Sequence, residues 1–133
     1  MERAAGQVDP AQTGLERGLT LLAAGAWFEA HEAFEEAWRA APPAERDFLQ
    51  GLVHVAVAWL QAGRGRRIGC ERQLAKATRR LGPYAPRHRG VDVAGVLAQL
   101  AVARSAVAGG SLTLAPVAPI APVERAAPAA PEL

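Results

Sequence analysis

His31, Glu35 and Trp38 are the residues of this sequence whose types and spacing best suit binding or proton transfer. His31 and Glu35 are four residues apart, so on a helix they lie one turn apart on the same face. An imidazole beside a carboxylate can act as an acid–base pair or supply two ligands to a divalent metal ion. A zinc site needs about three or four ligands, so another side chain would have to join this pair.

The next predicted helix offers His54 as the third ligand, and Cys70 is an outside candidate. Gln50 and His54 stand one turn apart on this helix, which is otherwise apolar almost all round. The short link at Pro42 and Pro43 predicts that the two helices are antiparallel neighbours, so the two polar pairs are expected to meet. The residues expected to line the resulting pocket are Trp27, Trp38 and Gln50.

The alternative role for His31 and Glu35 is structural, as a buried hydrogen-bonded pair that fixes how helices pack. Burying the two groups unpaired would cost several kcal/mol. We therefore expect the Glu35 carboxylate within hydrogen-bonding reach of His31 or Trp38. On the same helix, the exposed glutamates are expected to be Glu29, Glu32 and Glu36. The pattern is not that of the metalloprotease helix, which requires a second histidine at position 35.

The segment from Arg64 to Arg89 is rich in arginine and contains one acid, Glu71. The candidate basic surface consists of Arg72, Lys76, Arg79 and Arg80. A solvated face is the default interpretation, and a protein partner is the functional one. RNA is the remaining alternative, because clustered arginines attract phosphates. The segment has no interleaved exposed aromatic residues or known nucleic-acid motif, so a nucleic-acid partner is not expected.

Apolar periodicity predicts an all-α fold of about five helices in an antiparallel bundle or array. The expected helices cover residues 13–24, 26–40, 44–62, 67–81 and 93–108, and no sheet is expected. Thr13 to Glu16 have the spacing of a capping box at the start of the first helix. Asp92 is the expected N-cap of the last helix.

The domain organisation follows from these limits: a flexible leader over 1–12, a helical domain over 13–110 and an extended, proline-rich tail over 111–133. Proline spacing in the tail excludes a helix. Four apolar residues are predicted to lie along the bundle, and residues beyond about Arg125 are expected to add little stability. These four are Leu112, Leu114, Val117 and Ile120.

With 133 residues and one cysteine, the chain has room for a single core and no internal disulfide. We find no secretory signal and no apolar run of the length a membrane span needs, so a cytoplasmic protein without a membrane partner is expected. The net charge is only +2, so the basic pI of about 9.3 is not taken as evidence for a nucleic-acid partner. A small ligand or a protein remains the expected partner, and a homo-oligomer is left open.

Residues 25–39, which contain His31, Glu35 and Trp38, resemble the signature of the bacterial and archaeal family called domain of unknown function 309. Two further blocks resemble this family in the same order, Phe48 to Leu52 and Gly90 to Asp92. The resemblance covers roughly residues 13 to 110. It implies an all-helical fold and a motif suspected of binding metal, and it implies no established reaction.

Overall fold

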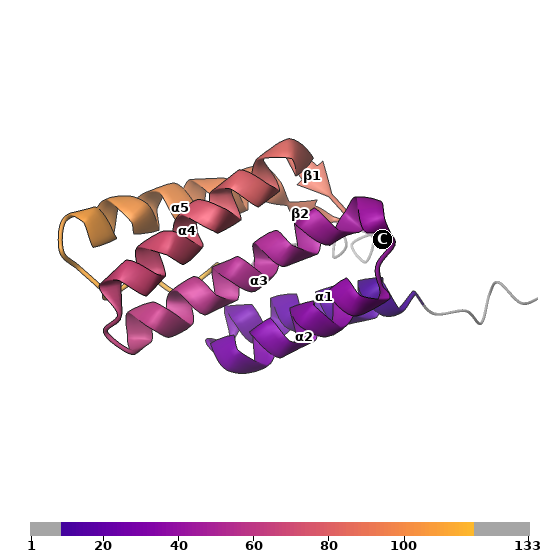
Figure 1. Ribbon diagram of the computed structural model, residues 1–133, viewed down its shortest axis with the longest axis horizontal. Helices are drawn as coiled ribbons and strands as arrows, with labels where there is room; N and C mark the ends of the chain where they lie inside the picture. The colour runs from indigo at the N-terminus through magenta and orange to yellow at the C-terminus, as the bar shows by residue number, and fades with distance from the viewer. Residues whose placement is uncertain (1–8, 119–133) are drawn as a thin grey trace, which may run out of the picture.

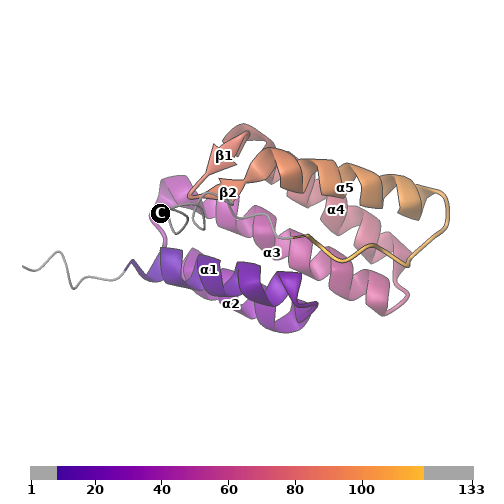
Figure 2. The ribbon, with the colours of Figure 1, turned by 180° about the vertical axis from the view of Figure 1, so that it is seen from behind.

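The computed structural model describes residues 9–118. Five α-helices make up most of this part of the chain: α1 (Pro10–Ala23), α2 (Trp27–Ala40), α3 (Pro43–Gly63), α4 (Arg67–Leu81) and α5 (Val93–Ala108). The all-α prediction is therefore confirmed. Each helix packs against the next one in the chain, and α3 lies between α2 and α4. Figure 1 shows α1 behind α2 and α5 behind α4, and Figure 2, seen from the opposite side, shows α1 and α5 in front, so the helices form two layers.

The first helix begins at Pro10, three residues before the predicted start. Its N-cap is Asp9, whose Oδ1 accepts a hydrogen bond from the Ala11 amide at 3.1 Å. Proline at the first helical position favours this start, because its missing N–H would have no partner there. The capping box predicted at Thr13 is wrong, since Thr13 and Glu16 both lie inside the helix. The start of the predicted leader, residues 1–8, lies outside the described residues.

The prediction of no sheet is also wrong. Two short strands, β1 (Arg87–His88) and β2 (Val91–Asp92), pair antiparallel between a 3-10 turn (Gly82–Tyr84) and α5. The two residues of the connecting turn, Arg89 and Gly90, have φ values of 49° and 80°. Positive φ at both central positions is typical of the type I′ turns that close two-residue hairpins. A strand pair this short has too few residues to produce visible alternation in the sequence.

Close approach between α3 and α4 depends on Gly51. A methyl group at this position would lie 2.7 Å from the Leu81 side chain, so alanine or any larger residue in place of Gly51 would push the helices apart. On α4, the residues that face this interface and the core are Cys70, Leu74, Ala77 and Leu81, and all four are buried. Asp92 caps α5 as predicted, accepting a hydrogen bond from the Gly95 amide at 2.9 Å.

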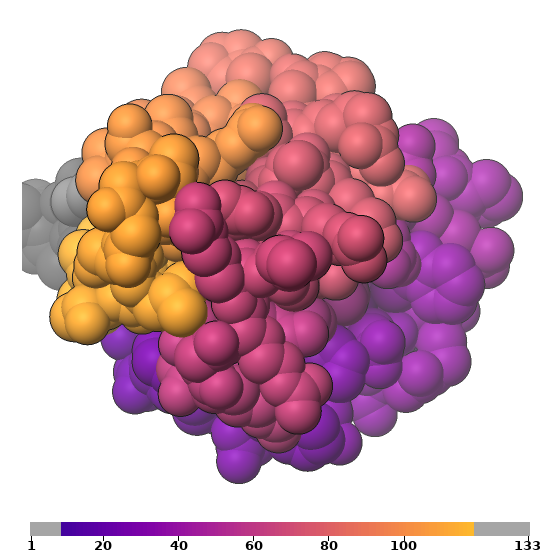
Figure 3. Space-filling model, turned by 60° about the vertical axis from the view of Figure 1, so that its left-hand side comes forward, coloured from indigo at the N-terminus to yellow at the C-terminus, as the bar shows by residue number. Residues whose placement is uncertain are grey.

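Residues 111–118 form no helix or strand and run back along α5 over α3 (Figure 2). Val117 is buried, while Leu112 and Leu114 are half-buried against the core. The predicted contact of these three residues with the bundle is confirmed. In the space-filling view (Figure 3), α5 and the segment after it form one surface with the end of α3 and the start of α4. Ile120 and the residues beyond Arg125 lie outside the described residues.

Candidate functional site

Trp27, His31, Glu35 and Trp38, which we call the α2 stripe, lie at the edge of the core rather than inside it. The fully buried face of this helix consists of Ala30, Ala33, Phe34 and Ala37. At 100° per residue, the stripe that contains His31 and Glu35 is offset from this face by about a quarter turn. The expectation that His31 and Glu35 form a buried pair is therefore wrong in the degree of burial. The side chains of His31 and Glu35 are 22% and 44% exposed.

His31 and Glu35 do pair as predicted, with His31 Nε2 and Glu35 Oε2 3.2 Å apart. The exposed ring of Phe28 lies beside His31, with a centroid distance of 5.6 Å. His31 Nδ1 is buried and has no hydrogen-bond partner among the described residues. The prediction for the other glutamates is confirmed, because Glu29, Glu32 and Glu36 are exposed.

The two tryptophans of the stripe mark the ends of the contact between α2 and α3. The Trp27 ring lies against Gly63, where a methyl group would be 3.4 Å from the ring. At the other end, the Arg46 guanidinium stacks over Trp38, 5.0 Å from the ring centroid. This cation–π contact and the half-buried rings stabilise the antiparallel packing of α2 on α3. The Trp27 indole nitrogen is buried without a partner in the described chain.

His54 does not join His31 and Glu35. It is buried on α3, and its Nδ1 lies 2.7 Å from Gln73 Oε1 on α4. Burial lowers the pKa of His54 and the positive charges of nearby Arg80, Lys76 and Arg79 lower it further, although the hydrogen bond with Gln73 raises it. The neutral form is therefore favoured near pH 7.

No group of three His, Cys, Asp or Glu side chains between residues 9 and 118 is arranged to hold a metal ion. The three-ligand set of His31, Glu35 and His54 is thus not assembled. Cys70 is buried as a free thiol, and burial raises its pKa. Gln50 is half-buried on α3, and no hydrogen bond joins it to the α2 pair within the described chain.

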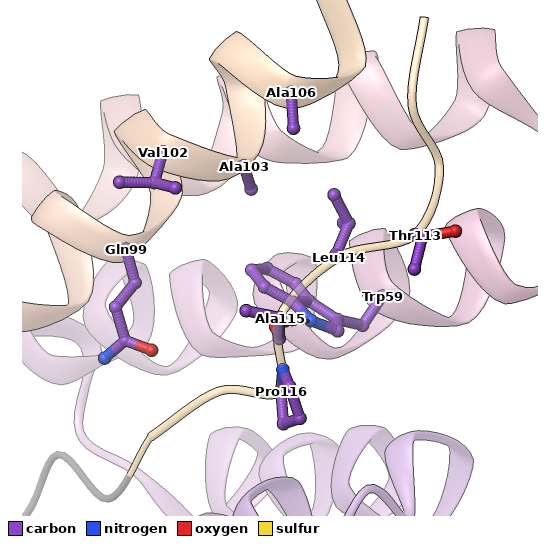
Figure 4. Close-up of a pocket in the computed structure, with 9 residues that line it drawn as sticks. All are labelled: Trp59, Gln99, Val102, Ala103, Ala106, Thr113, Leu114, Ala115 and Pro116. Atoms are coloured by element: carbon purple, nitrogen blue, oxygen red, sulfur yellow. Dashed lines mark hydrogen bonds between the residues drawn. The ribbon is translucent and has the colours of Figure 1, made fainter.

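Three hollows of the described surface lie away from the α2 stripe. One of about 300 Å³ is lined by α5, Trp59 and residues 113–116 (Figure 4). A second, of about 380 Å³, lies between the first residues of α1 and the end of α2. A third, of about 210 Å³, lies between Glu71 and Leu74 of α4 and Arg104 and Ala108 of α5. None of the three is lined by the residues predicted for the pocket, Trp27, Trp38 and Gln50.

The predicted basic residues lie along α4. Arg72, Lys76 and Arg79 are exposed, and they occur at the i, i+4 and i+7 positions of one stripe. Arg80 differs from them because its guanidinium is paired with Asp47 of α3 at 2.5 Å. We call Arg72, Lys76 and Arg79 the cationic stripe.

Sequence reasoning missed a polar cluster at the end of the bundle where α1 and α3 begin. Glu45 Oε1 accepts hydrogen bonds from Arg89 Nε at 2.6 Å and pairs with His88 Nε2 at 2.8 Å. The same Arg89 side chain reaches Asp9, the N-cap of α1, and Gln12 within α1. The rings of Phe48, Tyr84 and His88 stack beside it. Glu45 and Asp9 are more than 40 residues from Arg89 in the sequence, so no local spacing could have revealed these hydrogen bonds.

The charges of this cluster are held in their ionised forms. Burial raises the pKa of Glu45, but hydrogen bonds from Arg89 and His88 outweigh it and hold the pKa below its usual value. The pKa of Asp9 is lowered by the same balance, with Arg89 as the main partner. Burial alone would lower the pKa of Arg89, yet the bonds to Glu45 and Asp9 raise it. A carboxylate fixed in this way is suited to linking α1, α3 and the hairpin rather than to exchanging protons.

No helix of the described chain has the length and apolar character required to cross a membrane. Comparison with curated proteins found no match. The model of the family described as domain of unknown function (DUF309) matches residues 15–73, which include the whole α2 stripe and α3. The block from Gly90 to Asp92 lies outside the matched residues, so its resemblance to the family stays a prediction. The resemblance of this chain to the domain of unknown function 309 family is therefore confirmed over residues 15–73.

Proposed function

We propose that this chain is a cytoplasmic helical protein-interaction module in which the cationic stripe of α4 binds an acidic partner. The observation that carries the proposal is the exposure of Arg72, Lys76 and Arg79 along one face, with no acidic partner among the described residues. Their neighbours differ, because Arg67 pairs with Glu71 and Arg80 pairs with Asp47. An unneutralised row of charges favours and orients a partner of opposite charge.

The arrangement of His31 and Glu35 supports a packing role for the α2 stripe in such a module. Each group already has the other as a partner at 3.2 Å, and the stripe ends in two tryptophans that contact α3. Exposed pairs at this spacing contribute only about 0.3–0.5 kcal/mol, so most of the stabilisation comes from the aromatic contacts.

The proposal is tested with a fluorescent deca-glutamate peptide and a single-stranded RNA of ten nucleotides as probes. Fluorescence anisotropy would be measured for the wild type and for the triple variant R72E/K76E/R79E. The matched control is R17E/R39E/R104E, which changes the net charge equally at exposed arginines of α1, α2 and α5. Circular dichroism would confirm that each variant folds.

We expect the peptide to bind the wild type and the control alike, and the α4 variant at least tenfold more weakly. Raising the salt concentration should weaken the binding, because exposed charges are screened. Equal affinities of the two triple variants would reject the cationic stripe as the binding surface. Tighter binding of the RNA than of the peptide, lost in the α4 variant, would show a nucleic-acid rather than a protein partner.

A small-ligand or metal site at His31 and Glu35 remains a second candidate function. The observation in its favour is that His31 Nδ1 and Trp27 Nε1 are buried without hydrogen-bond partners in the described chain. Buried polar atoms without partners are uncommon and call for an explanation such as a water or an ion. Metal-dependent melting of the wild type and of H31L/E35L separates this candidate from the packing role.

A further inference from the structure

Residues 111–118 contact the bundle through hydrogen bonds that recognise their backbone. The buried Trp59 of α3 donates its indole N–H to the Ala115 carbonyl at 2.9 Å. Three residues later, the Ala118 amide donates to Gln99 Oε1 of α5 at 2.8 Å. Neither bond depends on the side chains of Ala115 or Ala118. Another chain of extended conformation can therefore make the same two bonds.

The residue that follows the bound carbonyl is Pro116. Proline has no N–H to leave unsatisfied and fixes its own φ near that of an extended chain, so less conformational entropy is lost on binding. The Pro116 ring points away from α5 (Figure 4). An indole N–H bound to a carbonyl next to proline is a contact that suits extended, proline-containing peptides.

The apolar contacts of the segment leave room for a larger ligand. Val117 is buried, whereas Leu114 points toward α5 into the hollow of about 300 Å³ (Figure 4). Ala103 and Ala106 form the opposite wall, and the adjoining Val102 is 67% exposed. The present occupant thus leaves part of the apolar surface uncovered beside Leu114.

We propose that the groove formed by Trp59, Gln99, Val102, Ala103 and Ala106 is a receptor for an extended peptide segment of a partner protein. Residues 111–118 occupy it as a tethered ligand that such a segment displaces. The partner segment has a proline after the carbonyl bound by Trp59, and an apolar side chain larger than leucine two residues before that proline. This surface lies on α3 and α5, so the proposal does not depend on the cationic stripe of α4.

A free peptide must displace residues 111–118 to bind the groove. This tethered segment competes with the peptide at an effective concentration in the millimolar range. The full-length variant V117D weakens the binding of residues 111–118 to the bundle, because it places a charge at a buried position. The full-length variant T113D is the matched control, since it adds the same charge at an exposed position of the same segment.

The probes are two labelled peptides, the sequence of residues 111–118 and the same sequence with L114F. Fluorescence anisotropy would measure their affinities for the wild type, V117D, T113D and V117D/Q99A. Gln99 is half-exposed, so Q99A removes the acceptor of the second backbone bond without emptying the core.

We expect V117D to bind the first peptide at least tenfold more tightly than the wild type or T113D. The L114F peptide should bind V117D at least threefold more tightly than its parent, and Q99A should weaken both. The proposal would be overturned if V117D folds but binds the peptides no more tightly than the wild type does. It would also be overturned if Q99A leaves the affinity of V117D for the peptides unchanged. Unfolding of V117D would overturn it as well, because the segment would then be an integral part of the core.

Discussion

Arg89 combines a backbone conformation that side chains disfavour with a side chain bound on three sides. Its φ of 49° is the one positive φ at a non-glycine residue in the described chain. The type I′ turn requires this conformation, and asparagine, aspartate or glycine would adopt it more readily. Arginine at this position is explained by its bonds to Glu45, Asp9 and Gln12, which connect the hairpin to two helices.

Removing the charge of Glu45 tests this explanation. E45Q leaves the 17%-exposed Arg89 without its closest counter-charge, so we expect the free energy of unfolding to fall by about 1–3 kcal/mol. The matched control is D47N, which removes a carboxylate from the more exposed pair with Arg80 and should cost less than about 1 kcal/mol. Urea denaturation would measure both. Equal losses in the two variants would contradict a special role for Glu45.

The same carboxylate predicts how stability changes in acid. A carboxyl group whose pKa is lower in the folded chain stabilises it above the unfolded pKa, about 4.3 for glutamate, and loses this contribution as the pH falls through the folded pKa. We expect the stability difference between the wild type and E45Q to be fully present at about pH 5, above the unfolded pKa of glutamate. It should shrink steadily below about pH 4. A difference that grows in acid would contradict the lowered pKa.

Among the elements, α2 shows which features the sequence can predict and which it cannot. The five helices were predictable because the apolar periodicity, the capping residues and the prolines and glycines that end helices are all local features of the sequence. The depth of the α2 stripe was not predictable, because Trp27 and Trp38 stood out in the sequence, whereas three of the four residues of the buried face are alanines. Small residues give a weak hydrophobic signal, yet they permit the closest packing. The cluster around Glu45 was not predictable, because it depends on contacts between distant segments.

The contact between α3 and α4 gives a prediction at this scale. G51A places a methyl group 2.7 Å from Leu81 in a packed interface, and we expect a loss of about 1–3 kcal/mol. The control is G69A on α4, where the methyl group meets only the end of the flexible Gln61 side chain. Alanine has the higher helix propensity by about 1 kcal/mol, so G69A should be neutral or stabilising. Thermal melting would measure both variants. If G69A is destabilised more than G51A, the explanation that α3 and α4 approach closely at Gly51 is wrong.

At the scale of the whole molecule, consecutive helices pack in chain order and one extended segment closes the back layer. α3 is central: it contacts α2 through the tryptophan stripe, α4 through Gly51 and the segment after α5 through Trp59. Each face of the molecule therefore has a different chemistry. The half-exposed pair of His31 and Glu35, the cationic stripe and the groove beside Trp59 lie on different surfaces, so each can be altered without changing the others.

The central claim is that His31 and Glu35 serve packing, and metal-dependent melting tests it most directly. A metal bound only by the folded chain raises the melting temperature, and this rise disappears when its ligands are removed. The measurement compares the wild type, purified without a histidine tag, with H31L/E35L, each alone and with Zn²⁺, Mn²⁺ or Mg²⁺. We predict that no metal raises the melting temperature of the wild type more than that of the variant, and that the variant folds with similar stability. A metal-induced rise in the wild type that is absent from H31L/E35L would contradict the claim and establish a binding site at the α2 pair.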